Sequence, residues 1–254
     1  MKLQILGCSG GIGRGLRTTS MLLDEDILID AGTGVGDLTL EALCRIDHVF
    51  LTHSHLDHVT SLPFLLDTAG PLRDGPITVY ALQETIATLQ AHLFNWKLWP
   101  DFTQIPDTES PWLHFQPIAL GETVLLNGRK ITPLPALHVV PTVGYLLDSG
   151  QASLAFSGDT IACQDFWDVL NQVKNLRYLL IETSFINAEN GIAFAARHYY
   201  PELLAENLPK LKQPAEIYIT HMGPSEQDEI MAEIHAAVSG TRPMKLAHGQ
   251  QFEF

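Results

Sequence analysis

The amino-acid sequence predicts a layered α/β protein in which two sheets pack face to face. The first half of the chain is rich in short apolar strands, and the second half alternates strands with helices. This order favours sheets that pack together and are covered by helices. No internal repeat, low-complexity tract or Ser/Gly-rich linker divides the 254 residues. We therefore expect a single domain spanning residues 1–254.

The strands of the first half are short apolar runs bounded by turn residues. A hairpin turn at Asp24-Glu25 joins two of them. Residues 36–45 are expected to form a helix, and residues 83–94 carry apolar side chains at helical spacing. The expected strands cover residues 3–6, 19–23, 26–30, 48–52 and 77–81.

In the second half, strands return after a proline-rich stretch around residues 100–117. Pro201 suits the first turn of a helix, because its missing N–H needs no partner there. The expected strands are 123–126, 129–136, 143–148, 152–159, 176–182, 215–220 and a closing strand, and the expected helices are 165–174, 201–211 and 225–238.

The composition argues against several classes of protein. Lys and Arg number 15 against 29 Asp and Glu, for a net charge of −14, and the basic residues never cluster beyond a pair such as Arg129-Lys130. Nucleic-acid binding needs a basic patch, so a nucleic-acid partner is not expected. A small anionic substrate fits if metal ions supply local positive charge.

Membrane and disulfide signals are also missing from the sequence. No run approaches the ~18 apolar residues of a membrane span, and the apolar run before Gly7 is too short for a signal peptide. We expect a cytoplasmic protein without a membrane partner. Cys8, Cys44 and Cys163 form no CxxC pair, so neither disulfides nor a thiolate metal site are expected.

The glycine-rich segment from Gly7 to Gly13 imitates a dinucleotide-binding turn. Such a turn must open a helix whose N-terminus meets the pyrophosphate. Here Gly15 and the β-branched Thr18 and Thr19 lead into a strand instead. We expect no nucleotide cofactor, and expect the glycines to let a loop turn sharply beside the active site.

The segment Leu-Thr-His-Ser-His-Leu-Asp-His-Val at residues 51–59 points to metal binding. It follows an extended strand, so His53 and His55, two residues apart, face the same side. The chain then turns, and Asp57 and His58 face a neighbouring point. Neutral imidazole and carboxylate suit zinc, iron or manganese. One short segment is thus expected to serve two ions.

Further ligands are expected where other apolar strands end. His138, Asp159 and His221 each follow such a run. The remaining histidines lack this setting. We interpret His48, His92, His114 and His235 as ordinary core or surface residues, and place His248 on the surface or behind the ligands.

In chain order, HSHLDH, His138, Ser-Gly-Asp159 and Thr-His221 resemble the metal motifs of the metallo-β-lactamase superfamily. The resemblance implies a four-layer αββα sandwich with a dinuclear site between the sheet edges. It also implies two divalent ions, zinc before iron or manganese. One ion would be held by His53, His55 and His138, and the other by Asp57, His58 and His221, with Asp159 bridging.

Four other stretches narrow the resemblance to the phosphodiesterase branch. Residues 138–145 look like its third-histidine segment, and residues 92–102 are similar to a segment of class II cyclic-nucleotide phosphodiesterases. Glu182 in Ile-Glu-Thr-Ser-Phe and His198 before a helix match positions shared by RNase Z and class II enzymes. The chain departs from the class II signature after HSHLDH, with Val-Thr-Ser-Leu-Pro-Phe-Leu-Leu in place of small residues.

Hydrolysis of a phosphodiester needs an in-line nucleophile, charge neutralisation and a proton for the leaving alkoxide. Two ions about 3.5–4 Å apart supply the first two, and lower the pKa of bound water to about 7, so a metal-bridged hydroxide is expected. The proton is assigned to His198 held by Glu182, and Asp57 is counted with them as catalytic. Alternatively, Glu182 is a surface charge at a strand end and His198 a helix cap.

The aromatic residues Phe94, Trp96, Trp99 and Phe102 have three interpretations. Phe94, Trp96 and Trp99 are predicted to bind substrate, as a wall or lid on which a base stacks. The same side chains suit a hydrophobic cluster under a long loop. They also suit the interface of a homodimer.

The leading hypothesis is therefore a binuclear metal-dependent phosphodiesterase for a small cyclic phosphodiester, 3′,5′-cAMP or 3′,5′-cGMP. An RNase Z-like tRNA 3′-processing endonuclease is the first alternative; the charge of −14 and the lack of a Gly/Pro/Lys-rich arm count against it. A lactonase or thioesterase of the same fold is the second. A catalytically silent binding or sensor protein would have no need for seven ligands.

Overall fold

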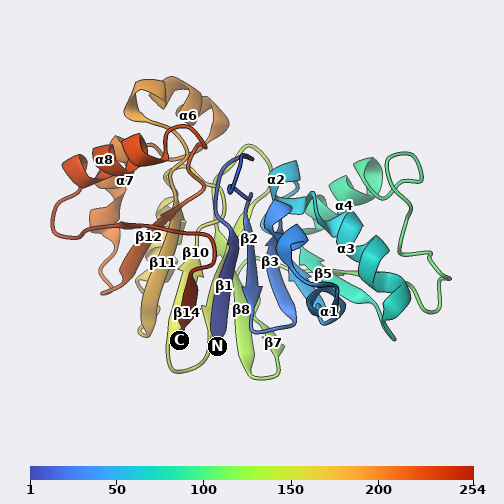
Figure 1. Ribbon diagram of the computed structural model, residues 1–254. Coiled ribbons are helices and arrows are strands. Elements are labelled where there is room, and N and C mark those ends of the chain that lie inside the picture. Colours follow the sequence, from blue (N-terminus) through green and yellow to red (C-terminus); the bar gives the residue numbers. More distant parts are fainter.

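Two seven-stranded sheets pack face to face in the computed structural model, which describes residues 1–254 (Figure 1). The first sheet has the order β14-β1-β2-β3-β4-β5-β6 and the second the order β13-β12-β11-β10-β9-β8-β7. The strands of the first are β1 (Lys2–Gly7), β2 (Ser20–Leu23), β3 (Ile27–Ala31), β4 (His48–Phe50), β5 (Ile77–Ala81), β6 (Leu113–Pro117) and β14 (Gln251–Glu253). Those of the second are β7 (Val124–Leu126), β8 (Arg129–Pro135), β9 (Val143–Asp148), β10 (Ser153–Phe156), β11 (Leu176–Glu182), β12 (Glu216–Thr220) and β13 (Met244–Lys245).

Helices cover the outer face of each sheet, which confirms the predicted αββα sandwich (Figure 1). The helices on the side of the first sheet are η1 (Thr33–Asp37), α1 (Leu40–Cys44), α2 (Leu56–Val59), α3 (Leu62–Ala69), η2 (Gly70–Leu72) and α4 (Gln83–His92). Those on the side of the second are α5 (Gln164–Leu170), η3 (Asn187–Glu189), α6 (Asn190–Ala196), α7 (Pro201–Asn207), η4 (Leu208–Lys210) and α8 (Gln227–Ala237). No helix has both the length and the apolar character that crossing a bilayer requires.

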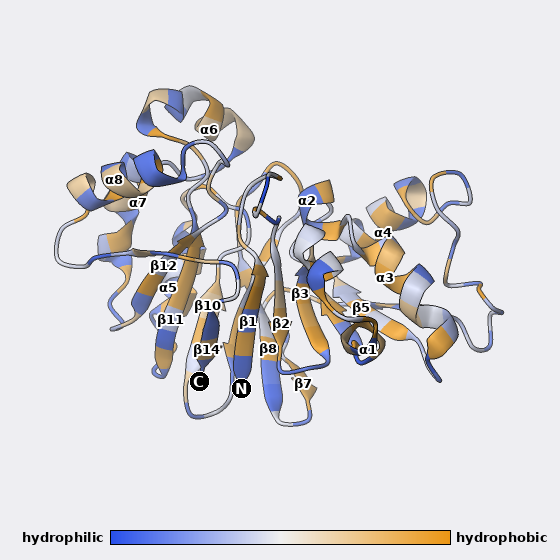
Figure 2. Ribbon diagram, in the orientation of Figure 1, coloured by the Kyte–Doolittle hydropathy of each residue, from blue (hydrophilic) through white to orange (hydrophobic).

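The strands supply apolar side chains to both of their faces. In β3, Ile27 and Ile29 point into the core between the sheets, whereas Leu28 packs under the helices. In β11, Leu180 joins the core between the sheets and Leu179 the outer core beneath α5, α7 and α8. Figure 2 shows the resulting apolar character along β3. Burial on both faces explains why these strands are continuous apolar runs.

One edge of the sandwich collects the ends of many strands. β3, β4, β5 and β6 are parallel to one another, as are β10, β11 and β12. β8 also runs parallel to β10, because both are antiparallel to β9. The carboxyl ends of these strands therefore meet at the same edge, where parallel sheets usually place their functional residues.

Several expected elements differ from those observed. The helix expected at 36–45 is split into η1 and α1. The proline-rich stretch contains β6, although no strand was expected there. The helices α3 and α6 were not expected either. Pro63 lies in the first turn of α3, where its missing N–H costs nothing.

A hydrogen bond and an ion pair connect elements that lie far apart in the sequence. The backbone of Phe254 accepts a hydrogen bond of 2.7 Å from the amino group of Met1, beside the β1–β14 pair. Arg129 of β8 is buried and donates to Asp26, at 2.8 Å from Nη2 to Oδ2. This ion pair joins the second sheet to the turn before β3.

Candidate metal centre and active site

The side chains predicted to bind metal lie together at the common strand-end edge. They form two overlapping groups in which the ligand atoms lie within 4.8 Å of one another. We call them the first metal group, which contains His53, His55, His138 and Asp159, and the second metal group, which contains Asp57, His58, Asp159 and His221. Asp159 belongs to both.

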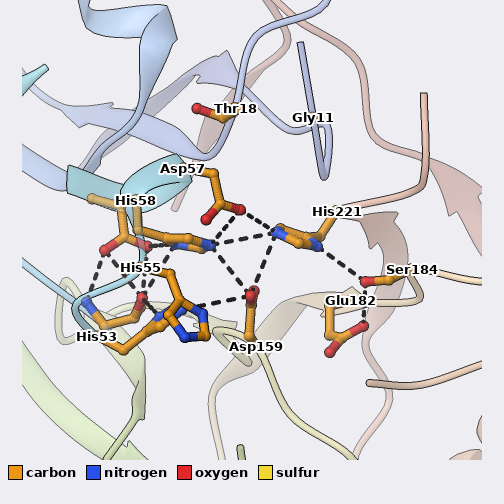
Figure 3. A network of polar contacts seen from close by, with 12 residues as sticks. Gly11, Thr18, His53, His55, Asp57, His58, Asp159, Glu182, Ser184 and His221 are labelled. Carbon is orange, nitrogen blue, oxygen red and sulfur yellow. Dashed lines mark hydrogen bonds and ion pairs between the residues drawn. The ribbon is translucent and has the colours of Figure 1, made fainter. Parts of the chain in front are cut away.

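The Oδ2 atom of Asp159 lies at the centre of the arrangement (Figure 3). It is 3.7 Å from Nε2 of His53, 3.3 Å from Nε2 of His58 and 3.4 Å from Nε2 of His221. Ligands about 2.0–2.1 Å from a tetrahedral zinc ion are separated from one another by about 3.3 Å. The spacing therefore matches a shell of ligands around a cation.

Two buried atoms of the metal groups have no hydrogen-bond partner in the protein. They are Nε2 of His53 and Oδ1 of Asp159. Buried polar atoms are nearly always paired, because an unpaired one costs free energy. Burial also lowers the pKa of His53 well below its usual range, which keeps its imidazole neutral and able to bind a metal. The donor set thus fits a divalent cation.

A sharp turn after β4 sets the direction of the HSHLDH side chains. β4 ends at Phe50, and α2 begins at Leu56 with His55 as its N-cap residue. His53 and His55 therefore lie on the extended connection and serve the first metal group. Asp57 and His58 lie in the single turn of α2 and serve the second.

Behind the ligands, a buried acid and hydroxyl orient two imidazoles. Oδ2 of Asp30 lies 2.7 Å from Nδ1 of His58, and the hydroxyl of Thr52 donates to the same carboxylate at 2.8 Å. Oγ of Thr52 also lies 3.0 Å from Nδ1 of His53. These contacts use Nδ1 and leave Nε2 of both rings facing the metal groups, a common arrangement in metal sites.

Asp30 and Thr52 were not among the predicted site residues. The signal was an acid inside the otherwise apolar Ile-Leu-Ile-Asp-Ala strand, because a charge in a strand buried on both faces needs partners. Asp30 has a left-handed backbone conformation, with φ 57°. His138 is oriented in a different way, with Nδ1 3.2 Å from the carbonyl oxygen of Arg197.

In the second metal group, acidic and imidazole side chains stabilise each other's charged forms. Burial opposes ionisation of Asp57, but hydrogen bonds from His221 and His58 hold its pKa well below the usual range. Burial likewise opposes protonation of His58, yet Asp159 and Asp30 raise its pKa. In the first group, burial lowers the pKa of His138 to about 4.

Glu182 and His198 form a pair beside both metal groups. Nδ1 of His198 lies 2.7 Å from Oε1 of Glu182. The ring centroid of His198 lies 4.8 Å from that of His138 and 5.5 Å from that of His221. Burial opposes the charge on His198, but Glu182 raises its pKa to about 9.

Both alternatives to this pairing are wrong. Glu182 is fully buried, so it is not a surface charge. Tyr200 is the N-cap residue of α7, so His198 does not cap the helix that follows it.

The glycine-rich loop packs directly against the second metal group, and no helix follows it. A Cβ atom on Gly10 would lie 2.7 Å from the carbonyl oxygen of His221 and 3.1 Å from its Nδ1. The backbone N–H of His221 donates to the carbonyl of Cys8 at 2.8 Å. A glycine is needed here because the loop must approach His221 this closely.

The aromatic segment is not brought into either metal group. Phe94 and Phe102 are buried in the core beneath the helices of the first sheet, and Trp99 packs against the same core. Trp96 is 59% exposed. Phe94 therefore serves packing, and Trp96 is the predicted substrate-binding aromatic most accessible to solvent.

The other histidines lie outside both metal groups. His92 and His114 are exposed, and His48 is half-buried. Nε2 of His235 contacts the carbonyl of Pro243 at 2.8 Å, and Nδ1 of His248 contacts that of Leu6 at 2.9 Å.

Comparisons with known proteins agree with this architecture. A probable 3′,5′-cyclic-nucleotide phosphodiesterase of Yersinia pestis is 27% identical over 208 residues, covering 72% of this chain and 58% of the relative. A 3′,5′-cyclic-nucleotide phosphodiesterase of Aliivibrio fischeri is also 27% identical, covering 82% of this chain and 74% of the relative. The chain thus spans just over half the length of the first relative and about three quarters of the second.

Among solved structures, unliganded yeast PDE1 superimposes with a TM-score of 0.81 at 16% sequence identity, covering 100% of this chain and 99% of the other. This likeness shows a shared fold. The family model described as "Beta-lactamase superfamily domain" matches residues 25–244, which include the ligand-bearing segments of both metal groups. The chain belongs to the beta-lactamase superfamily and has the metallo-β-lactamase fold.

Proposed function

We propose that this protein hydrolyses a small cyclic phosphodiester, with 3′,5′-cAMP or 3′,5′-cGMP as the substrate. The observation that carries the proposal is the pair of the fully buried Glu182 and the largely buried His198 beside two metal groups. The two curated relatives described above carry the name of cyclic-nucleotide phosphodiesterase, which supports the same substrate class.

Each metal group would hold one divalent ion, with Asp159 shared between them. Zinc is the proposed metal because imidazole and carboxylate ligands suit it, and iron or manganese are alternatives. Bound ions would neutralise the phosphoryl oxygens and lower the pKa of bound water. The substrate therefore needs no basic patch, which a protein of net charge −14 does not offer.

His198 is proposed to protonate the leaving alkoxide. Its Nδ1–H donates to Glu182, so the second proton of the imidazolium, on Nε2, can pass to the leaving oxygen. Glu182 keeps the ring oriented and stabilises its positive charge. Asp57 is proposed as a ligand whose Oδ2 faces His58 and His221, while its other oxygen can orient the attacking water.

The test compares four substrates with protein whose metal content has been measured. The substrates are 3′,5′-cAMP, 3′,5′-cGMP, bis(p-nitrophenyl) phosphate and a lactone. We expect preferential turnover of a cyclic nucleotide that is lost on chelation and restored by zinc or manganese.

The other outcomes have distinct meanings. Turnover of bis(p-nitrophenyl) phosphate alone keeps phosphodiester chemistry but removes the cyclic nucleotide. Lactone turnover without diester turnover contradicts the phosphodiesterase. Cleavage of a precursor tRNA with no cyclic-nucleotide activity would favour an RNase Z-like enzyme.

A further inference from the structure

We propose that Ser184 is a positioning residue that connects the second metal group to the Glu182–His198 pair. The inference rests on the proposed function in one respect, since it takes His221 as a ligand and Glu182–His198 as the proton donor. Ser184 lies two residues beyond β11 and is buried, at 6% exposure. Its hydroxyl is drawn between Glu182 and His221 in Figure 3.

The hydroxyl of Ser184 contacts three functional side chains. Its Oγ lies 2.9 Å from Oε2 of Glu182, 3.0 Å from Nδ1 of His221 and 3.2 Å from Nδ1 of His198. No other hydroxyl reaches both a metal group and the Glu182–His198 pair.

The chemistry of the partners fixes the direction of these bonds. Nε2 of His221 faces Asp57 and Asp159, so the ring proton belongs on Nδ1, which donates to Ser184. The carboxylate of Glu182 can only accept, so the hydroxyl proton of Ser184 goes to Oε2. The result is a chain from His221 through Ser184 to Glu182.

Glu182 is a suitable end for this chain because both of its oxygens are occupied. Oε1 accepts from the backbone N–H of Thr160 at 2.9 Å and from His198 at 2.7 Å. Oε2 accepts from Ser184 and from the backbone N–H of Tyr199 at 3.3 Å. A fully buried carboxylate with this many donors is held in one position. Because Glu182 cannot move, the hydroxyl of Ser184 is also fixed and holds the ring of His221 in one orientation.

Three of the other ligand histidines are oriented by groups that make no hydrogen bond to the side chain of Glu182 or His198. His58 uses Asp30, His53 uses Thr52, and His138 uses the carbonyl of Arg197. Ser184 is therefore expected to link the geometry of the second metal group to that of the proton donor. Asp30, Thr52 and the carbonyl of Arg197 are not expected to do so.

The first test measures zinc binding to metal-free protein by competition with a chromophoric chelator, which needs no substrate. Ser184→Ala should weaken the affinity of the second metal group for zinc about 10- to 100-fold, as is typical when a group that supports a ligand is removed. Binding of the first ion should be unchanged. Ser184→Thr keeps the hydroxyl and should restore most of the affinity. Ser149→Ala is the control, because that hydroxyl bonds only backbone atoms in the β9–β10 turn.

The second test separates positioning from general structural damage. Ser184→Ala should lower turnover of the alkoxide-releasing substrate several-fold in the wild-type background. In a His198→Ala background the proton donor is already absent. There, Ser184→Ala should lower turnover only through weaker zinc binding. The two substitutions are compared at saturating zinc by their changes in the free energy of activation. If the changes caused by Ser184→Ala and His198→Ala are fully additive, Ser184 does not act through the Glu182–His198 pair.

A third measurement requires no variant. Nitrogen-15 NMR of histidine-labelled, zinc-loaded wild-type protein should show His221 protonated at Nδ1. An unprotonated Nδ1, or unchanged zinc affinity in Ser184→Ala, contradicts the proposal. Because zinc affinity and tautomer are read without a substrate, these results stand even if the substrate comparison rejects the phosphodiesterase.

Discussion

At the scale of the residue, the site depends on side chains that are both buried and polar. His53, His58, Asp159 and Glu182 are each at most 2% exposed. Groups of this kind destabilise a protein unless they find partners. Here the partners are one another and the supporting groups behind them, and the unpaired Nε2 of His53 is placed where it can bind a cation.

Replacing His198 by Ala separates its proposed role from metal binding. Turnover of a cyclic nucleotide should fall about 10²- to 10⁴-fold, the usual worth of a general acid. Metal content, measured by atomic emission, should stay near that of wild type. The exposed His114→Ala is the matched control and should leave both unchanged. Loss of metal in His198→Ala would identify a ligand instead of a proton donor.

Gly10→Ala tests how closely the glycine-rich loop must approach His221. The new Cβ would lie 2.7 Å from the carbonyl oxygen of His221, so the loop or the ligand must move. We expect a loss of about 1–3 kcal/mol in the free energy of unfolding, as for other overpacked sites, together with weaker zinc binding. Gly36→Ala, which meets no atom within 4 Å, should be close to neutral in both. Equal effects of the two substitutions would contradict a local role for Gly10.

At the scale of the element, the pattern of apolar residues predicts structure well where a strand is buried on both faces. The strands expected at 26–30, 77–81 and 176–182 match β3, β5 and β11 closely. His53, Asp159 and His221 follow other strands of the same kind, namely β4, β10 and β12. The ligand segments could therefore be placed at strand ends from the sequence alone.

The elements that escaped prediction depend on tertiary contacts. α6 is seven residues long with Ile192 and Phe194 exposed, so it lacks a buried apolar stripe. β6 exposes His114 and lies in a proline-rich stretch, where its pairing with β5 decides its conformation. The contacts of Ser184 and Arg197 could not be read from the sequence either, since they join residues brought together only by the fold.

The pair between Asp26 and Arg129 gives a pH-dependent prediction for the junction of the two sheets. The hydrogen bond from Arg129 holds the pKa of Asp26 below its ordinary value. The stabilisation is therefore present above the unfolded pKa of about 3.9 and is lost as the pH falls through the lower folded value.

Asp26→Asn should accordingly reduce the free energy of unfolding by about 1–2 kcal/mol at pH 7, and by progressively less below pH 4. Urea unfolding in the presence of a chelator measures this without interference from bound metal. Asp67→Asn is the control, because Asp67 is exposed and its side chain forms no ion pair or hydrogen bond. A difference between wild type and Asp26→Asn that does not depend on pH would reject the ion pair as its cause.

At the scale of the whole molecule, the metal groups gather acidic and imidazole side chains from both sheets of a chain with net charge −14. Divalent ions bound to the folded state alone should stabilise it by mass action, by about 2.7 kcal/mol for a site at 100 times its Kd. Zinc should raise the midpoint of thermal unfolding, and a chelator should lower it.

The variant Asp159→Asn supplies the matched control for this prediction. It replaces the carboxylate common to both metal groups, so most of the zinc-dependent rise should vanish. A rise of the same size in wild type and Asp159→Asn would mean that zinc binds elsewhere.

The division of ligands between the two sheets has a further consequence. The exposed connection at Leu120-Gly121 separates a first part of the chain with His53, His55, Asp57 and His58 from a second part with His138, Asp159 and His221. Neither part holds a complete metal group, and β14 of the second part completes the sheet of the first. Two fragments cut at this connection would therefore have to reassemble, exchanging that strand, before zinc could be held tightly, and zinc binding would report the reassembly of the fold.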